Sequence, residues 1–389
     1  MPKINTIPIA IPYVGSEELV QLEEVLASGW LTQGPKVAAF EQVFAEQHEA
    51  KHAIAVTSCT TGLHLALVGL GIGPGDEVIV PAFTWIATAN VVEQCGARPV
   101  FADVSTDDFN VLPEKMLAKI TSKTRAIIPV HLFGLCADMD SLLAHIPDNV
   151  AVIEDAACAA GASYKGRYAG TLGDVGVFSF HPRKTITTGE GGMITTNNDE
   201  LAAHLRCLRN HGAAISEEER HSGPRPHILP AFPVLGYNYR MSDLQGAVGL
   251  VQTSRLPFLL DERMRMAKMY REMLSEINWL QLPAEPSSGR HGWQSYVCLL
   301  SESAPVSAIQ FMDIMQRAKI STRPGTHVVP LQEYYKQKFN YTDDDFPGAV
   351  ICGLRSIALP LHNRLDDADI NRVCQLIYEI DSGLLKANV

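Results

Sequence analysis

The sequence predicts an α/β protein in which a mostly parallel sheet lies between helices, followed by a smaller C-terminal α+β domain. Strand-like and helix-like segments alternate from His52 to Glu154. A long amphipathic segment, Leu256 to Ile277, then leads into a region of mixed strands and helices. The chain has 389 residues, more than a single core usually supports. Two domains are therefore expected, at 1–255 and 256–389.

The first half of the chain shows the alternation most clearly. Ser16 can cap a helix that Gly29 ends, and a second helix is expected from Lys36 to Gln47. In a parallel sheet of this kind, ligands bind beyond the carboxyl ends of the strands. Strands are predicted at 52–56, 77–80, 99–104, 126–130 and 150–154, with helices after residue 61 and at 82–96, 112–120 and 138–146.

The stretch Val177 to Thr196, VFSFHPRKTITTGEGGMITT, contains two apolar β-favouring runs joined by a Gly-rich turn. Lys184 lies in the bend after Pro182. A lysine at the edge of an apolar sheet can be desolvated, which makes its amine a better nucleophile. The alternative is a surface lysine in a Gly-rich hairpin.

The second half is expected to be helical at its centre and mixed afterwards. A long, polar, Pro-rich segment, 211–233, reads as a loop. Ser242 or Asp243 can cap the next helix. The remaining helices are predicted at 199–209, 243–254, 256–277, 306–318 and 366–384, and the strands at 295–300 and 356–359.

Composition excludes several classes of protein. The net charge of −11 argues against binding of nucleic acid. The eight cysteines are scattered, with no C-x-x-C pair and no Cys/His cluster at metal spacing, which predicts reduced thiols in a cytoplasmic enzyme without a metal. The N-terminus lacks a signal-peptide pattern, and no window approaches 18 uninterrupted apolar residues, so neither secretion nor a membrane span is expected.

Two segments outside the lysine stretch indicate a ligand site. Thr57 to Gly62 follows a strand and starts a helix, and free N–H groups at such a helix start bind phosphate. An ordinary helix cap with spare threonines is the competing interpretation. Asp155 directly follows a buried strand. Because both lie at carboxyl ends of strands, they are expected to face one crevice near Lys184.

Taken together, the motifs resemble those of the DegT-type (StrS-like) sugar aminotransferases, pyridoxal 5′-phosphate (PLP) enzymes of the aspartate-aminotransferase fold (fold type I). The resemblance runs from end to end. It includes SGWLTQGPKVAAFE at 28–41, SCTTGLHLAL at 58–67, GDEVIVPAFTWIATAN at 75–90, IEDAACAAGA at 153–162, GDVGVFSFHPRKTITTGEGGMITT at 173–196, GYNYRMSDLQGAVG at 236–249 and SIALPLH at 356–362.

The resemblance implies a role for each matching residue. Lys184 matches the lysine that binds PLP covalently and shuttles a proton, and Asp155 matches the carboxylate that pairs with the pyridine nitrogen. Thr60, Thr61 and Ser179 match the phosphate ligands.

Other matches concern the face and surroundings of the cofactor. Trp85 matches the aromatic residue that stacks on the ring, with a core tryptophan as the alternative. Asn238 matches a residue that reaches the cofactor phosphate of a neighbouring subunit, which implies a homodimer with shared active sites. Cys158 stands beside the cofactor where many relatives carry Gln, Glu or His, and a thiol is a weaker hydrogen-bond partner.

For four further residues the resemblance indicates a role less specifically. Trp30, Thr32 and His327 are candidates for contacts with the sugar or nucleotide, with loop packing as the alternative. His181 is expected to support the bend. A branch of the family has histidine in place of the lysine and performs a deoxygenation, so Lys184 favours transamination.

The implied function is a PLP-dependent aminotransferase. It would move an amino group from L-glutamate to a keto-sugar, above all a nucleotide-linked 4-keto-6-deoxy hexose, for a surface polysaccharide or a secondary metabolite. The alternatives are a PLP-dependent sugar dehydratase, an aminotransferase for a cyclitol or 3-keto-sugar, and a non-catalytic regulatory or DNA-binding protein. Acidity argues against the last of these.

Overall fold

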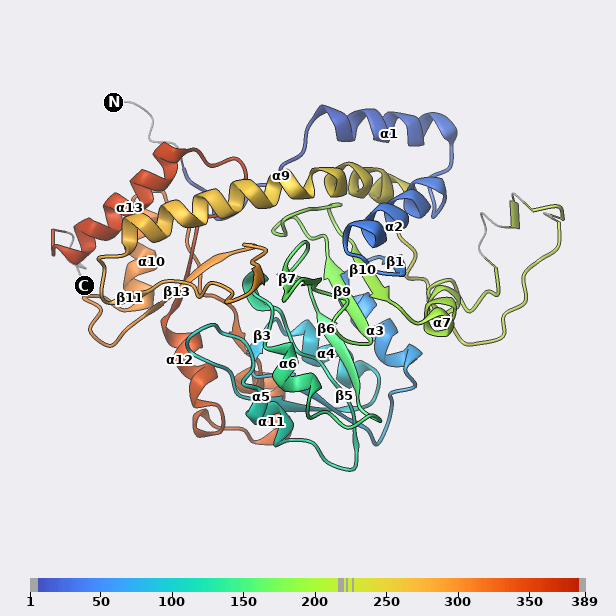
Figure 1. The fold of residues 1–389 in the computed structure, drawn as a ribbon, viewed down its shortest axis with the longest axis horizontal. Helices are drawn as coiled ribbons and strands as arrows, with labels where there is room; N and C mark the ends of the chain where they lie inside the picture. The colour runs from blue at the N-terminus through green and yellow to red at the C-terminus, as the bar shows by residue number, and fades with distance from the viewer. Residues whose placement is uncertain (1–5, 216–219, 222, 226, 385–389) are drawn as a thin grey trace.

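The computed structural model describes residues 6–215, 220–221, 223–225 and 227–384. Its centre is a seven-stranded sheet with the order β1-β10-β9-β6-β5-β2-β4 (Figure 1). Strands β9, β6, β5, β2 and β4 are parallel, and β10 is antiparallel to both of its neighbours. The predicted mostly parallel sheet is thus confirmed. In sheet order the strands are β1 (His52–Val56), β10 (Gly192–Thr196), β9 (Val175–Ser179), β6 (Ala151–Asp155), β5 (Thr124–Ile127), β2 (Glu77–Pro81) and β4 (Arg98–Ala102).

Helices cover both faces of this sheet. Successive residues of β2 show why, since Val78 and Val80 are buried in one core and Ile79 in another. Helices α3 (Cys59–Gly69), α4 (Ala87–Gln94) and α7 (Asp199–Arg209) pack on the first face. The other face is covered by α2 (Pro35–Gln47), α5 (Pro113–Leu117) and α6 (Met139–Leu143).

A single helix, α9 (Asp243–Leu274), replaces the two helices predicted on either side of residue 255. Ser242 caps it, and Pro257 lies inside it. The apolar face continues across the proline, with Leu256 and Leu260 buried, so side-chain packing outweighs the lost backbone hydrogen bond. Figure 1 shows α9 crossing the upper part of the molecule, with α1 above it. We propose that the boundary between the predicted domains, 1–255 and 256–389, lies within this helix.

The C-terminal part contains a three-stranded antiparallel sheet, β11 (Leu280–Gln281), β13 (Tyr296–Leu300) and β15 (Ser356–Leu359). Both faces of β13 are buried: Val297 and Leu299 pack against the large core, and Cys298 and Leu300 against a second one. The second core is closed by α9, α10 (Ala308–Arg317) and α13 (Asp367–Asp381). Helices α11 (Glu333–Phe339) and α12 (Pro347–Arg355) were not predicted.

Two local predictions were wrong in detail. The helix expected from residue 82 begins only at Ala87, because Phe83 and Thr84 form a short strand, β3, that pairs with β14 (His327–Val328). Helix α1 (Ser16–Ser28) is capped at Gly15, whose N–H donates to the Glu18 carboxylate at 2.8 Å. The remaining short strands are β7 (Ser163–Tyr164), β8 (Arg167–Tyr168) and β12 (Gly289–Arg290).

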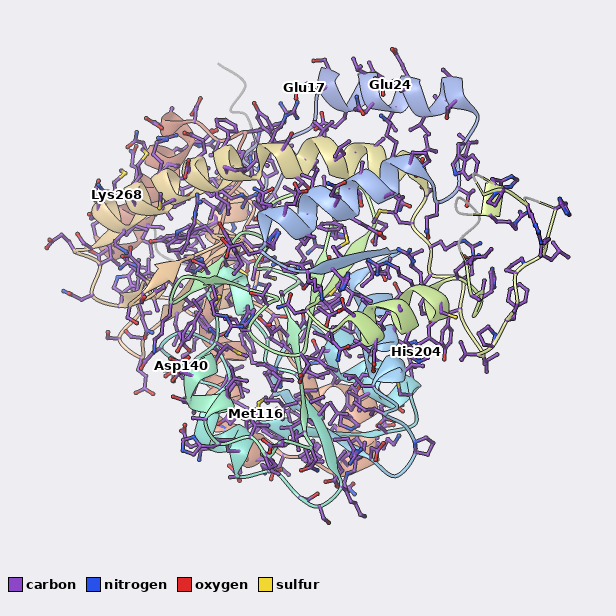
Figure 2. All side chains as sticks on the ribbon, turned by 45° about the vertical axis from the view of Figure 1, so that its right-hand side comes forward. Glu17, Glu24, Met116, Asp140, His204 and Lys268 are labelled. Carbon is purple, nitrogen blue, oxygen red and sulfur yellow. The ribbon has the colours of Figure 1, made fainter. Side chains whose placement is uncertain are left out.

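Many charged side chains lie at the molecular surface. Figure 2 shows Glu24 on α1 and Lys268 on α9 at the periphery of the molecule. Described parts of the predicted loop 211–233 extend away from the body, beyond α7 (Figure 1), while 216–219, 222 and 226 lie outside the described residues. None of the helices in the described ranges combines the length and apolar character that a membrane crossing requires.

Candidate active site

The bend after β9 presents Lys184 at the carboxyl end of the sheet. Backbone hydrogen bonds define the bend: the Lys184 N–H donates to His181 O at 2.8 Å, and the Thr188 N–H donates to Phe180 O at 3.0 Å. The side chain of Lys184 is half-buried, and its Nζ lies 3.1 Å from Cys158 Sγ. Strands β9 and β10 form the predicted hairpin, so Lys184 sits in a fixed turn between two core strands.

Asp155 ends β6, the strand beside β9, and is almost completely buried. Its Oδ2 accepts a hydrogen bond from Thr88 Oγ1 at 2.8 Å, and its Oδ1 accepts from the Ala157 N–H at 3.1 Å. Burial raises the pKa of Asp155, although these two hydrogen bonds and the charge of Lys184 act in the opposite direction. A buried carboxylate of this kind is stabilised by a cationic ligand group.

Thr88 is a contact that sequence reasoning missed. It lies one helical turn after Trp85, in TWIATAN, and the start of α4 carries it over the end of β6. Cys59 was missed as well: its Sγ is 4.0 Å from Asp155 Oδ1, and burial raises its pKa well above the ordinary thiol value. Both residues lie in the first turn of a helix that follows a strand, and this position in the sequence was the signal that could have identified them.

Behind Asp155, a second buried pair fixes the end of β6. His131 Nε2 lies 2.8 Å from Glu154 Oε2, and both side chains are fully buried. Glu154 also accepts backbone N–H bonds of 2.7 Å from Gly170, Leu172 and Gly173. This arrangement holds the strand end rigidly, which positions Asp155.

The start of α3 lies against the ends of β9 and β10. Ser58 caps the helix by accepting from the Thr61 N–H at 3.1 Å. Thr61 Oγ1 is used locally, since it donates to Ser58 O at 2.8 Å. Within the described residues Thr60 makes no side-chain hydrogen bond and is only half-buried, so its hydroxyl and the first N–H groups of α3 are available to an anion.

Gly192 allows the backbone of β10 to lie directly against the backbone at the start of α3. A Cβ on Gly192 would lie 2.5 Å from the carbonyl carbon of Ser58. Gly192 pairs with Ser179 in the sheet, which brings Ser179 to the same place. Ser179 Oγ accepts from the His181 N–H at 3.4 Å. Predicted phosphate ligands from two distant segments therefore meet at the start of α3.

Trp85 and His327 are brought together by the β3–β14 pair. Their rings are 5.4 Å apart and inclined by 53°. Trp85 is 56% exposed, which excludes the alternative of a core tryptophan. Trp85 lies three residues before Thr88, the residue that donates to Asp155.

Three residues that were predicted to line the site are not joined to Lys184 or Asp155 in the described part of the chain. Trp30 packs edge-on against His221 with ring centroids 5.5 Å apart, and Thr32 is exposed beside it. Asn238 is exposed on the segment that pairs with the end of β1. In the described part of the chain, no hydrogen bond or ring contact joins these three residues to Lys184 or Asp155.

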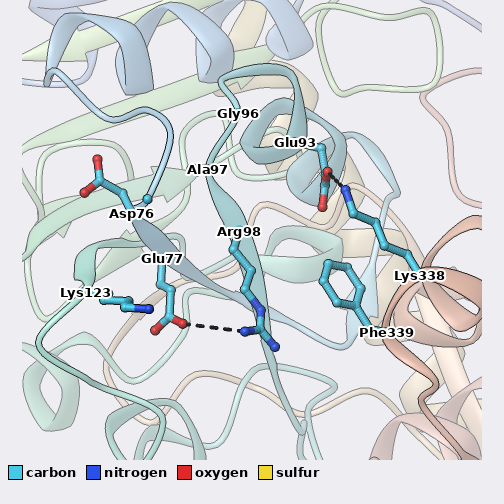
Figure 3. Close-up of a pocket in the computed structure, with 10 residues that line it drawn as sticks. Asp76, Glu77, Glu93, Gly96, Ala97, Arg98, Lys123, Lys338 and Phe339 are labelled. Atoms are coloured by element: carbon cyan, nitrogen blue, oxygen red, sulfur yellow. Dashed lines mark hydrogen bonds and ion pairs between the residues drawn. The ribbon is translucent and has the colours of Figure 1, made fainter.

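A hollow of about 540 Å³ lies at the opposite edge of the sheet, where β2 and β4 begin (Figure 3). Four of its charged groups form two pairs: Glu77 lies 3.9 Å from Arg98, and Lys338 contacts Glu93. The carboxyl ends of the parallel strands lie on the other side. This hollow is therefore separate from the Lys184 site.

The residues at the carboxyl edge fit PLP. Lys184 offers an amine, the buried Asp155 a partner for the pyridine nitrogen, and the start of α3 with Thr60 and Ser179 a place for the phosphate. These three chemical groups come from β9, β6 and α3, which are adjacent in the structure.

The chain is similar to known proteins over nearly its whole length. The chain is 40% identical to GDP-perosamine synthase of Caulobacter vibrioides, over 98% of this chain and all of the relative. It is 38% identical to spore coat polysaccharide biosynthesis protein SpsC of Bacillus subtilis, over 97% of each.

Among solved structures, Spr1654 from Streptococcus pneumoniae has been obtained in a PLP-form and a PMP-form. Each form is 27% identical to this chain with a TM-score of 0.90, over 98% of this chain and at least 98% of that one. PLP is accordingly the cofactor. The sequence model of the DegT/DnrJ/EryC1/StrS aminotransferase family matches residues 12–378. The chain belongs to this family and is an aminotransferase.

Proposed function

We propose that this aminotransferase moves an amino group from L-glutamate to the ketone of a nucleotide-linked 4-keto-6-deoxy hexose, and so makes an amino sugar for a polysaccharide or a secondary metabolite. The observation that carries the proposal is the half-buried amine of Lys184 beside the buried Asp155. The similarity to GDP-perosamine synthase and SpsC supports the class of acceptor and product.

Each residue has a distinct task in this proposal. PLP, when bound, withdraws electrons from the substrate carbon and carries the amino group between substrates. Asp155 keeps the pyridine nitrogen protonated, and Thr88 holds its carboxylate in place. Lys184 Nζ moves the proton at the substrate carbon. Thr60, Ser179 and the start of α3 bind the phosphate, and Trp85 covers one face of the ring.

The test is an activity panel. The purified enzyme is incubated with ¹⁵N-labelled L-glutamate and a set of GDP-, UDP- and dTDP-linked 3-keto and 4-keto sugars, and with a keto-cyclitol. Transfer of the label to a 4-keto-6-deoxy sugar is expected. Loss of a sugar oxygen without transfer of label would instead identify a dehydratase. Lys184→Ala should abolish transfer and the adduct trapped by borohydride, and persistence of both would contradict the role of Lys184.

We further propose that the active unit is a cytoplasmic homodimer in which Asn238 serves the site of the second copy. Asn238 is exposed and makes no side-chain hydrogen bond within the described residues. Apolar side chains just before it are exposed as well, among them Leu229, Phe232 and Leu235, the last at 90%. Exposed apolar surface of this kind is typical of an interface.

Mixing two inactive variants tests the shared site. In a hybrid of a Lys184→Ala copy and an Asn238→Ala copy, one site carries both defects and the other carries neither. Activity is therefore expected to reappear after the two variants are unfolded and refolded together. If each copy instead uses its own Asn238, every hybrid site is defective and the mixture stays inactive.

A further inference from the structure

Lys184 and Cys158 form a contact between an amine and a thiol. Lys184 Nζ donates to Cys158 Sγ at 3.1 Å. The other cysteine side chains that make hydrogen bonds in the described ranges, those of Cys59 and Cys352, contact oxygen atoms. All eight cysteines are free. Among the residues that the structure describes, Cys158 is therefore the cysteine whose sulfur lies against a nucleophilic nitrogen, and the proposed transfer of an amino group makes no use of this sulfur.

The two backbone segments that carry this contact are fixed by hydrogen bonds. Cys158 lies in the turn after β6, where the Ala159 N–H donates to Ala156 O at 2.9 Å. On the other side, the carbonyl of Arg183, which precedes Lys184, accepts from Gln294 Nε2 at 2.9 Å. Between these fixed backbones the lysine side chain is flexible, because its four-carbon stem rotates freely. Lys184 Nζ can therefore move from contact distance to bonding distance of the sulfur without a change in the backbone.

The two thiols of the site differ in how they meet a small oxidant. The side chains of Cys158 and Lys184 are both half-buried, so a small solute can reach them. Burial, and then the charge of Asp155, raises the pKa of Cys59 well above the ordinary thiol value. Because a thiol reacts as its thiolate, Cys59 stays reduced. The sulfur that remains for an oxidant in the site is the one beside Lys184.

We propose that a hydroperoxide converts this contact into a reversible covalent cross-link, a sulfenamide between Cys158 and Lys184. In the first step the sulfur attacks the O–O bond and becomes a sulfenic acid, a two-electron oxidation in which the peroxide is reduced to water or an alcohol. In the second step the Lys184 amine attacks this sulfur. The S–N bond forms, the S–O bond breaks, and the departing hydroxide takes a proton from the nitrogen and leaves as water.

The cross-link and PLP require the same nitrogen. A nitrogen bonded to sulfur is not free to bind PLP covalently, and a nitrogen that holds PLP is not free to attack the sulfenic acid. This competition rests on the proposed role of Lys184, whereas the cross-link itself rests on the contact with Cys158 alone. A thiol reverses the modification by attacking the sulfur, which releases the amine and leaves a disulfide that a second thiol reduces. Oxidation therefore switches the site off, and reduction restores it.

Peptide mass spectrometry tests the cross-link directly. PLP-free and PLP-loaded enzyme are treated with hydrogen peroxide at neutral pH and digested with trypsin without a reductant. Since trypsin does not cleave after a modified lysine, the expected product joins peptide 126–165 to peptide 184–206 and is two hydrogen atoms lighter than their sum. Fragmentation distinguishes Cys158 from Cys136 in the first peptide. The product should form in the PLP-free enzyme, be nearly absent from the PLP-loaded enzyme and disappear after addition of dithiothreitol.

Two variants and a second measurement serve as controls. Cys158→Ser should abolish the cross-linked peptide, and Cys59→Ser, the matched change at the other thiol of the site, should retain it. Oxidised wild type should fail to trap added PLP with borohydride until dithiothreitol is added, whereas Cys158→Ser should trap it equally before and after peroxide.

Two outcomes would overturn the inference. They are recovery of Cys158 as a sulfinic acid beside unmodified Lys184, and a disulfide between Cys158 and Cys59. A cross-link that forms equally well with PLP bound would confirm the bond and contradict the proposed role of Lys184. The failure of this inference is therefore distinguishable from the failure of the proposed function.

Discussion

Replacing Thr88 by valine tests how the protein controls the charge of Asp155. The hydroxyl of Thr88 donates to Asp155 Oδ2 at 2.8 Å in a fully buried position. A hydrogen bond to a charged group contributes about 1.5–3 kcal/mol. Since one pKa unit corresponds to about 1.4 kcal/mol, Thr88→Val should raise the pKa of Asp155 by about 1–2 units.

The sign of the effect on stability follows from the direction of that shift. Burial already raises the pKa of Asp155 in the folded protein above its value in the unfolded chain. The folded apoprotein therefore loses stability as the pH rises from the ordinary aspartate pKa through the folded pKa. Thr88→Val deepens this loss, so its cost should be about 1.5–3 kcal/mol at neutral pH and smaller near pH ~4, where a larger share of Asp155 is protonated.

The measurement is urea unfolding of the apoprotein at both pH values. Thr84→Val is the matched control: Thr84 is buried on the same segment, and its hydroxyl lies 3.3 Å from that of Thr88, without contacting Asp155. Its cost should not depend on pH. Equal pH dependence of the two variants would refute the reasoning, because it would separate the ionisation of Asp155 from the Thr88 hydroxyl.

Three further predictions follow from contacts in the site. Gly192→Ala places a Cβ 2.5 Å from the backbone at the start of α3, so PLP affinity measured by equilibrium dialysis should fall, with a loss of stability of about 1–3 kcal/mol. Gly73→Ala, where the nearest atom to the new Cβ would lie 3.8 Å away, should change neither. His131→Ala removes the side-chain partner of the buried Glu154 and should cost about 3–5 kcal/mol in urea unfolding; a cost below about 1 kcal/mol would show that the backbone N–H groups suffice. Because burial raises its pKa, Cys59 should resist iodoacetamide at neutral pH in the folded protein and react after unfolding, as read by peptide mass spectrometry; rapid labelling in the native state would contradict this.

The sequence allowed a good prediction of the strands of the large sheet and of the groups at their carboxyl ends. Strand–helix alternation is a local pattern, Asp155 is the last residue of β6, and Lys184 lies in the bend that follows β9. Helix α9 could not be predicted as one element because Pro257 is a local signal for a break, whereas the packing of Leu256 and Leu260 that overrides it is tertiary.

Contacts between segments that are distant in the sequence could not be predicted from local sequence patterns. Thr88 and Asp155 are far apart in sequence, and only the position of α4 over the end of β6 joins them. Trp85 could be read as core or surface from sequence, and its pairing with His327 decides the matter.

The pairing of β3 with β14 also limits how the enzyme can move. His327 and Val328 pair with Thr84 and Phe83, and the Val329 N–H donates to Ala82 O at 2.8 Å. These bonds join a segment anchored on β15 directly to the strand that precedes Trp85. A hinge motion of the C-terminal sheet away from the large one would have to break them. The rings of Trp85 and His327 therefore keep their spacing of 5.4 Å when the C-terminal sheet shifts, because the paired backbones that carry them move together.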